Sequence, residues 1–340
     1  MARVLVIRLS ALGDVAMLVP VVASVAERYP QDRFYVMTRV AFTPLFNNLS
    51  FNVNTISVDV RGKHKGFFGL LKLVFKSVFM GFSHVVDEHD VLRSKLIRWA
   101  IMLTGRKVRH IDKGRKEKQQ MIESKVLNPP LKHTVDRYLD TFVRLGFPAE
   151  ISFNSILDYV MQDYSIIEKI TGKKEGKWIG IAPFARHEGK MYPLEKMERV
   201  VEMLSKEAGT TVFLLGGGRK EKHVLDEWQS KYAHTINLTG QLNLEKELQV
   251  MSMMDVVVSM DSANMHLASL VNTPVVSIWG ATHPSLGFYG FRQDIDNAIQ
   301  MDLPYRPTSV FGDAPCDEDC MKGITEQMVV DKIHQVMNKK

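Results

Sequence analysis

The sequence predicts an α/β protein built from two domains, each with a parallel sheet, that face each other across a cleft. Short apolar runs alternate with helix-like stretches through both halves of the 340-residue chain. A charged, glycine-containing segment at residues 166–177, "IIEKITGKKEGK", interrupts this alternation and is typical of a linker. We therefore expect one domain at residues 1–165, a second at 178–324, and a C-terminal helix at 325–340 that packs back on the first domain.

The individual elements follow from hydrophobic periodicity and turn residues. In the first half, apolar runs predict strands at residues 4–7, 34–38, 55–58, 84–87 and 108–111. The stretches between them predict helices at residues 15–25, 67–82, 95–103 and 133–145. In the second half, we expect strands at residues 178–182, 211–215, 235–237, 256–259 and 275–278. The matching helices are expected at residues 193–206, 222–231, 244–253, 263–270 and 325–337.

The helix expected at residues 67–82 is unusually rich in aromatic side chains. Phe68, Leu71, Phe75, Val78 and Phe79 fall on one face at helical spacing. We assign this face to the core of the first domain, with part of it left exposed. The alternative is a membrane-facing helix, because lysines flank the apolar surface and a basic loop precedes it.

The turn after the first strand carries an acid, in "RLSALGDVAMLVP" at residues 8–20. Gly13 permits a tight turn, and Ser10 or Asp14 could cap the helix that follows. A single glycine is not the dinucleotide-binding fingerprint, so close approach to a pyrophosphate is not encoded here. Asp14 is therefore either a plain carboxylate in the first turn of a helix or a chemically active group held in a cleft.

Composition and charge narrow the classes of protein. The net charge is +6, and two basic segments, residues 61–66 and 105–118, both lie in the first half. They suggest an anionic partner, either nucleic acid or phosphorylated lipid, although no aromatic residues interleave with them. We find no apolar run of the ~18 residues that a membrane span needs and no signal peptide. Two cysteines cannot build a disulfide framework or complete a zinc site, so a reducing cytoplasm fits best.

Polar residues follow the strands of the second half, where parallel sheets bind ligands. These segments are "APFARHEGKMYP", "GGGRKE", "MDSANMH" and "WGATHP" at residues 182–193, 216–221, 260–266 and 279–284. Arg186 and Lys190 could balance a diphosphate, and the helix that begins near Asp261 offers free amide groups. Taken singly, Asp261 could be only a helix cap, His266 a core histidine, and the two cations surface charges. Taken together, the segments favour a phosphate-bearing ligand.

Several of these stretches resemble a known family. "RLSALGDV", "DEHDVLRS", "KMYP", "DSANMHLA" and "WGATHP" occur in the order seen in the heptosyltransferases of glycosyltransferase family 9, and the resemblance covers nearly the whole chain. It implies the GT-B arrangement of two facing Rossmann-like domains. It also implies transfer of a heptose from ADP-heptose, with inversion and without a metal ion or other cofactor, to the inner core of lipopolysaccharide.

The resemblance also implies roles for individual residues. Asp14 matches the general base, and Lys190 matches a lysine that contacts the donor diphosphate. The donor-binding positions are Arg186, Lys190, Gly217, Glu221, Asp261, Ser262, Ala263 and His266. The acceptor-binding positions are Ser10, Arg61, Lys63, Arg115 and Lys118. Tyr305 and Thr308 stand where relatives often have cysteines, so we assign no metal role to Cys316 and Cys320.

These roles define the expected partners and the alternatives. We expect a nucleotide sugar, an anionic glycolipid acceptor and peripheral contact with the inner membrane surface, with no nucleic acid, in a cytoplasmic protein. One alternative is a GT-B enzyme that uses another nucleotide sugar, as a transferase or an epimerase. The basic first half argues against an epimerase, which has no acceptor to bind. The other alternative is a non-catalytic two-lobed protein that binds an anion.

Overall fold

The computed structural model describes residues 1–314, 316 and 319–339. The last residue of the expected C-terminal helix, Lys340, lies outside this described part. The chain forms two compact units. Unit 1 comprises Met1–Lys113 and Thr134–Val160, and unit 2 comprises Gly114–His133 and Met161–Lys340.

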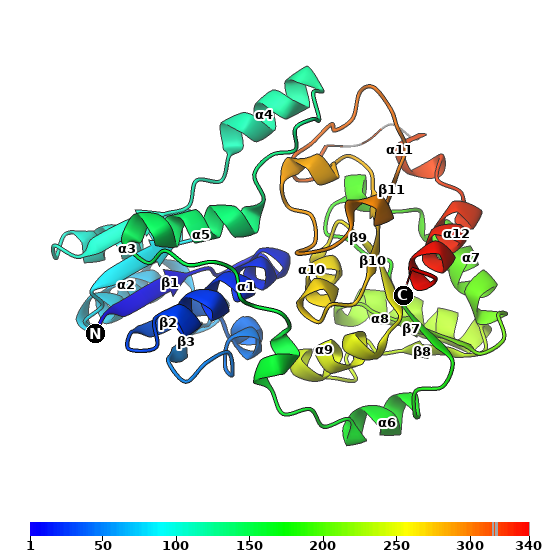
Figure 1. The fold of residues 1–340 in the computed structure, drawn as a ribbon, viewed down its shortest axis with the longest axis horizontal. Coiled ribbons are helices and arrows are strands. Elements are labelled where there is room, and N and C mark those ends of the chain that lie inside the picture. Colours follow the sequence, from blue (N-terminus) through cyan, green and yellow to red (C-terminus); the bar gives the residue numbers. More distant parts are fainter. Residues whose placement is uncertain (315, 317–318, 340) are drawn as a thin grey trace. The chain divides into compact units, whose positions relative to one another are not determined.

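Unit 1 is built on a five-stranded parallel sheet with the strand order β3-β2-β1-β4-β5 (Figure 1). Its strands are β1 (Arg3–Ile7), β2 (Arg33–Arg39), β3 (Val53–Val58), β4 (His84–Asp87) and β5 (Lys107–His110). Its helices are α1 (Leu12–Arg28), the 3-10 helix η1 (Val40–Leu45), α2 (Gly66–Phe79), α3 (Leu92–Met102), α5 (Thr134–Leu145) and η2 (Ile156–Tyr159).

Helices cover both faces of this sheet because its central strand is buried on both sides. Leu5 and Ile7 of β1 point to the face covered by α2 and α3, whose buried residues Leu73 and Ile97 belong to the same apolar cluster. Side chains alternate along a strand, so the residues between them point to the opposite face. Helices α1 and α5 pack against each other and complete the unit.

Unit 2 contains a six-stranded parallel sheet with the strand order β11-β10-β9-β6-β7-β8. Its strands are β6 (Lys177–Ala182), β7 (Thr210–Leu214), β8 (Thr235–Asn237), β9 (Val256–Met260), β10 (Val275–Trp279) and β11 (Ala298–Gln300). Its α-helices are α4 (Arg115–Ser124), α6 (Ser165–Thr171), α7 (Leu194–Ser205), α8 (Gly218–Lys231), α9 (Leu244–Met253), α10 (Ala263–Leu270), α11 (Asp319–Lys322) and α12 (Glu326–Met337). Short 3-10 helices are η3 (Glu188–Lys190), η4 (Pro284–Leu286) and η5 (Ile295–Asn297).

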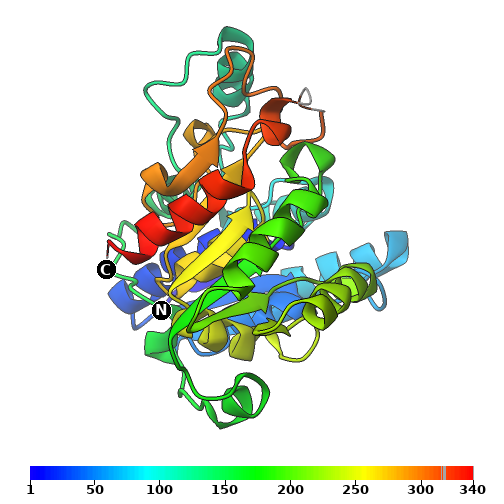
Figure 2. The same cartoon turned by 90° about the vertical axis from the view of Figure 1, so that its right-hand side faces the viewer.

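The C-terminal helix α12 packs against the sheet of unit 2. Val329 and Ile333 of α12 join the apolar cluster formed by β6, β7, β9 and α7. Figure 2 shows α12, in red, beside the yellow strands of unit 2. The apolar stripe of α12 is therefore buried within unit 2.

The α/β class with two parallel sheets, predicted from the sequence, is confirmed. The bounds of β4, β8, α9 and α10 agree with the expected ranges. Among the described residues, four helices and strands were missed: α4, within a basic segment, α6, within the expected linker, the three-residue strand β11 and the short helix α11. The short 3-10 helices were not expected either. Helix α4 buries Met121 alone along its length, so its sequence lacks the apolar stripe by which helices are recognised.

Helix α2 corrects the assignment of its aromatic face. Phe68, Phe75 and Phe79 are 83%, 61% and 84% exposed, whereas Leu73 and Ser77 on the opposite side are buried. The aromatic residues of the face that the sequence assigned to the core therefore point outward, whereas Leu71 and Val78 of the same face are partly buried and Val78 packs against the core cluster. The buried residues Leu73 and Ser77 of α2 face the sheet instead of the aromatic side chains.

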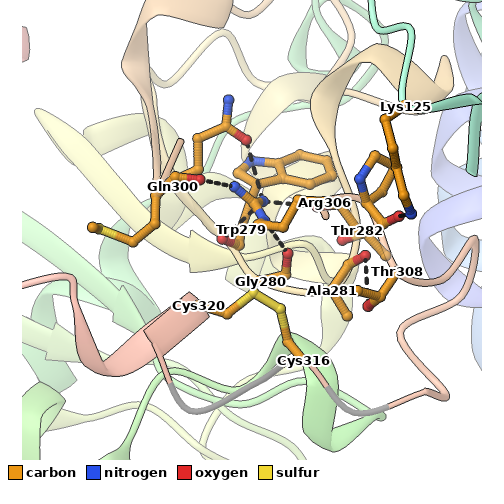
Figure 3. Close-up of a disulfide and its surroundings, with 12 residues drawn as sticks. Lys125, Trp279, Gly280, Ala281, Thr282, Gln300, Arg306, Thr308, Cys316 and Cys320 are labelled. Atoms are coloured by element: carbon orange, nitrogen blue, oxygen red, sulfur yellow. Dashed lines mark hydrogen bonds between the residues drawn. A yellow bond between two sulfur atoms is a disulfide. The ribbon is translucent and has the colours of Figure 1, made fainter. Parts of the chain in front are cut away.

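Unit 2 also contains the two cysteines, for which the sequence indicated no disulfide framework. Cys316 and Cys320 are joined by a disulfide (Figure 3). Beside it, the buried Arg306 side chain donates hydrogen bonds to the carbonyl oxygens of Gly280 and Thr282. These contacts hold the segment after β10 in place, and burial lowers the pKa of Arg306 to about 10.

Candidate functional site

The turn after β1 in unit 1 holds an ion pair between Arg8 and Asp14. Arg8 Nη2 lies 2.5 Å from Asp14 Oδ2, and the two side chains are 7% and 38% exposed. The backbone amide of Ala11 also donates to Asp14 Oδ2, at 3.1 Å. Asp14 thus stabilises the first turn of α1 and also presents its carboxylate to solvent. The two interpretations of Asp14, a carboxylate of the first helical turn and a chemically active group, are therefore compatible.

Residues from other parts of unit 1 surround this pair. Arg8 Nη1 donates to the carbonyl oxygen of Glu88, and its guanidinium lies 5.8 Å from the centre of the Tyr138 ring. The Tyr138 hydroxyl donates to the carbonyl oxygen of Asp14, at 3.2 Å. Because β1, β4 and α5 each contribute a contact, the position of Arg8 and Asp14 is fixed by the core of the unit.

Ser10 lies beside the same turn. Its hydroxyl is 3.2 Å from His89 Nε2, which follows β4, so Ser10 does not cap α1. Burial lowers the pKa of His89 to about 3, and the nearby Arg8 guanidinium acts in the same direction. His89 is therefore neutral at physiological pH and can exchange a hydrogen bond with Ser10, but it carries no charge.

Electrostatics distinguish the acids around this turn. Burial alone would lower the pKa of Arg8, but the Asp14 carboxylate outweighs it and the pKa is raised. Glu88 is fully buried, and loss of solvation raises its pKa well above the ordinary value. Asp14 is the more accessible of the two carboxyl groups and the one paired with a cation.

Arg61 and Lys63, expected to bind an acceptor, lie on a separate loop of unit 1. Asp59 orders this loop because its carboxylate accepts hydrogen bonds from the amides of residues 61–63, which lower the pKa of Asp59. Both cationic side chains are exposed. The loop therefore presents two positive charges on an ordered backbone.

In unit 2, Lys190 and Asp261 form a buried ion pair. Lys190 Nζ lies 2.6 Å from Asp261 Oδ2, and the side chains are 14% and 5% exposed. Thr282, after β10, donates to the same carboxylate oxygen at 2.8 Å. Asp261 is therefore not a simple helix cap, since its carboxylate joins residues from three strand ends.

Close backbone packing fixes Lys190. The amide of Ala281 donates to the carbonyl oxygen of Gly189 at 2.8 Å. A Cβ atom on Gly280 would lie 2.5 Å from that same oxygen, and one on Gly312 would lie 2.5 Å from Lys190 Cγ. A side chain at Gly280 would displace the Gly189 backbone, and one at Gly312, whose φ is +75°, would displace the Lys190 side chain.

A second lysine contacts the same aromatic ring as Lys190, and it comes from α4, a helix that the sequence did not predict. Lys118 Nζ of α4 is 5.4 Å from the centre of the Phe288 ring, and Lys190 Nζ is 5.5 Å from the same ring. Lys118 was expected to bind the acceptor together with Arg115, which is exposed on α4. Within unit 2, Lys118 therefore contacts the same ring as Lys190, an expected donor-binding residue.

The remaining expected donor positions lie at strand ends of unit 2. The amide of Gly217 donates to Glu221 Oε2 at 2.6 Å, at the start of α8. Ser262 and Ala263 begin α10 and are partly accessible, and His266 is buried one turn later. Arg186, after β6, is exposed. Lys190 and Asp261 are in direct contact, whereas the Gly217–Glu221 pair follows a different strand.

Sequence reasoning missed four residues of these clusters: Arg8, Tyr138, Thr282 and Phe288. Arg8 stood within the quoted motif "RLSALGDV", and a cation six residues before an acid was an available signal. Tyr138 and Phe288 lie in segments without a polar motif, so no local signal points to them. Among the described residues, no cluster of three or more His, Cys, Asp or Glu side chains is arranged to hold a metal ion.

Comparison with known proteins identifies the family. A family model described as glycosyltransferase family 9 (heptosyltransferase) matches residues 76–297. The chain belongs to this family. A relative, the lipopolysaccharide core heptosyltransferase OpsX of Haemophilus influenzae, is 22% identical over 282 residues, which are 82% of this chain and 79% of OpsX. Family membership makes the chain a glycosyltransferase and confirms the resemblance noted in the sequence.

Solved structures show the same fold. The E. coli heptosyltransferase WaaC with ADP superposes with a TM-score of 0.69 at 18% identity, covering 98% of this chain and 99% of WaaC. WaaC with ADP-2-deoxy-2-fluoro heptose gives a TM-score of 0.67 at 18% identity, with the same coverage. The GT-B class, with two Rossmann-like domains, is therefore confirmed for this family 9 chain. None of its described helices has the length and apolar character needed to cross a bilayer.

Proposed function

We propose that this family 9 chain transfers a heptose from ADP-heptose to an acidic sugar of the lipopolysaccharide inner core, in the cytoplasm. The observation that carries the proposal is the pairing of Asp14 with Arg8 at the first strand end of a chain with this family membership. The name of OpsX and the ADP-2-deoxy-2-fluoro heptose bound to WaaC support the choice of acceptor class and donor.

Asp14 acts as the general base in this proposal. The hydroxyl of a sugar is a poor nucleophile, and a carboxylate that takes its proton during attack on the anomeric carbon accelerates the transfer. The Arg8 guanidinium stabilises the negative charge of Asp14, and the partial exposure of Asp14 leaves it accessible to an acceptor. Attack from the side opposite the leaving diphosphate inverts the anomeric centre. His89 and Ser10 keep the turn in place without adding charge.

Lys190 and the start of α10 act on the leaving group. The nucleoside diphosphate gains negative charge as its bond to the sugar breaks. A half-buried lysine and the free amides at Ser262 and Ala263 can stabilise that charge in the role that a divalent cation serves in other transferases. Asp261 orients Lys190 through the ion pair, and Glu221 is available to a ribose hydroxyl.

Asp14→Asn tests the proposal. We expect turnover, measured as ADP release from ADP-heptose with an inner-core acceptor, to fall roughly 10²–10⁴-fold, the usual contribution of a positioned base. The affinity for ADP should stay unchanged, because ADP is assigned to unit 2. Excess EDTA in the same assay should leave the wild-type rate unaffected.

Asp136→Asn is the matched control, because Asp136 is an exposed carboxylate in the first turn of another helix of unit 1, α5. It should retain full turnover. A folded Asp14→Asn protein with wild-type turnover would refute the base assignment. Loss of activity in EDTA that magnesium restores would refute the roles of Lys190 and the α10 amides.

A further inference from the structure

Helices α2 and α3 of unit 1 expose a large apolar surface. Folded proteins rarely leave several large aromatic side chains uncovered next to one another. The exposed members are Phe67, Phe68, Phe75 and Phe79 of α2, and Leu92, Trp99, Met102 and Leu103 on and after α3. We call these eight residues the α2–α3 patch.

The two helices present this patch in one direction. Leu73 of α2 and Ile97 of α3 belong to the same apolar cluster, which covers one face of the sheet. The helices also pack against each other. In each helix the exposed residues lie opposite the buried ones, so both outward faces point away from the sheet on the same side of unit 1.

The segments that carry the patch are basic, and the acids Asp59, Asp90 and Asp112 lie only at their ends. Residues 60–86 and 91–111, which contain both helices, include no aspartate or glutamate. Exposed cations of these segments are Arg61, Lys63, Lys65, Lys72, Lys76, Arg106, Lys107 and Arg109. Lys72 lies between Phe68 and Phe75 on the outward face of α2, so positive charge is part of the apolar surface as well as its surroundings.

We propose that the α2–α3 patch binds the surface of an anionic lipid bilayer. Aromatic side chains at helical spacing can enter the boundary between headgroups and acyl chains, and lysines beside them reach the phosphates. Insertion of aromatic side chains and contact of lysines with phosphates do not require a membrane-spanning helix. A second copy of the chain fits less well, because pairing two such patches brings lysines of the same charge together. The proposal goes beyond the proposed transfer reaction and does not depend on it.

Trp99 supplies a spectroscopic probe inside the patch. The chain has four tryptophans. Trp99 is 44% exposed, whereas Trp178, Trp228 and Trp279 are 1%, 2% and 0% exposed. A change in tryptophan emission on addition of vesicles therefore reports on Trp99. Bromine atoms on lipid chains quench a tryptophan that enters the bilayer.

The experiment mixes the full-length protein, without substrates, with phosphatidylglycerol vesicles and with phosphatidylcholine vesicles. We expect co-sedimentation and a blue shift of Trp99 emission with the anionic vesicles, quenching by brominated chains, and little binding to the zwitterionic ones. Phe79→Ser should weaken binding about tenfold, the effect of losing one buried aromatic side chain. Replacing Lys72 and Lys76 by alanine should weaken it about 30-fold at low salt.

Phe51→Ser is the matched control, because Phe51 is 80% exposed in unit 1 and lies outside the patch, against 84% for Phe79. It should bind vesicles like the wild type. Equal loss in both variants, or no quenching by brominated lipid, would overturn the proposal. A dimer in sedimentation velocity that Phe79→Ser dissociates, without vesicle binding by the wild type, would assign the patch to a second copy. Because the vesicle experiment contains no substrate, a lack of vesicle binding leaves the proposed transfer reaction untouched. Vesicle binding by a protein without transferase activity would support the membrane proposal while refuting the transfer reaction.

Discussion

Arg8 is the residue that gives the first turn of unit 1 its chemical character. It is 5% exposed and contacts an acid, a backbone carbonyl and an aromatic ring. A buried guanidinium is costly unless it is paired, and Asp14 supplies the charge that stabilises it, although Arg8 Nε has no hydrogen-bond partner among the described residues. The position of Asp14 is therefore set by the burial of Arg8 as much as by the first turn of α1.

Glu88 provides a test of this buried charge network at the level of one residue. Burial raises its pKa, so the folded protein keeps a proton that the unfolded chain loses above pH ~4.3. Above that pH the folded state binds more protons than the unfolded state, and the free energy of unfolding falls with rising pH, by up to about 1.4 kcal/mol per pH unit. We expect Glu88→Gln to remove this dependence, so that the variant gains stability relative to the wild type from pH 5 to pH 8 in urea titrations.

Glu150→Gln serves as the control for that measurement, since Glu150 is exposed in unit 1. Its stability should follow the wild-type curve at every pH. If Glu88→Gln lowered stability by the same amount across the range, Glu88 would be ionised in the fold and the direction of its pKa shift would be wrong.

Among the elements, α4 departs furthest from what the sequence indicated. Its ten residues, "RKEKQQMIES", favour a helix by intrinsic propensity but bury a single side chain, Met121. It follows β5 in the chain, yet it belongs to unit 2, where Lys125 at its end donates to the carbonyl oxygen of Pro307. Contacts with a distant segment, not its own pattern, decide where this helix lies.

Lys118 tests the role of α4. Because its amine lies over the same ring as Lys190, we expect Lys118→Ala to weaken ADP binding by about 3–10-fold, as the loss of one partly exposed charge contact does. Isothermal titration with ADP measures this effect. Lys116→Ala, on the same helix and exposed, should bind ADP normally. Unchanged ADP affinity together with a raised Michaelis constant for the acceptor would show that Lys118 binds the acceptor, as the sequence suggested.

At the scale of the whole molecule, positive charge is distributed unevenly. The net charge is +6, and the acid-free segments 60–86 and 91–111 both belong to unit 1. Exposed charges of this kind act over about 10 Å at 0.1 M salt, so their influence on an anionic acceptor depends on ionic strength. We infer that unit 1 attracts the acceptor and that unit 2 binds the nucleotide.

Replacing Arg61 and Lys63 together by alanine tests this division. With a deacylated acceptor that has no lipid chain, we expect the Michaelis constant for the acceptor to rise and its salt dependence to flatten, while calorimetry with ADP is unchanged. Arg28 and Arg33, exposed elsewhere in unit 1, give a control with the same change of charge. Equal damage to ADP binding in the Arg61/Lys63 variant would mean that the two substrates are assigned to the wrong units.

The sequence by itself determined the α/β class, most strands and the strand ends that carry polar residues. It did so because burial of a parallel strand requires a continuous apolar run, and that signal is local. The bounds of β4 and α10, and the presence of acids at positions 14 and 261, could be taken directly from such runs. Family resemblance added the roles, which local pattern does not contain.

Only the tertiary structure decided which faces and partners these residues have. An apolar stripe on α2 is compatible with a core position or with an exposed surface. In the structure, Leu73 packs in the core of unit 1 and Phe79 is exposed. The meeting of Lys118 with Phe288, and of Arg8 with Tyr138, joins segments far apart in the sequence. Such contacts form because the whole chain must satisfy its buried charges and fill its core at once, and no local window records that requirement.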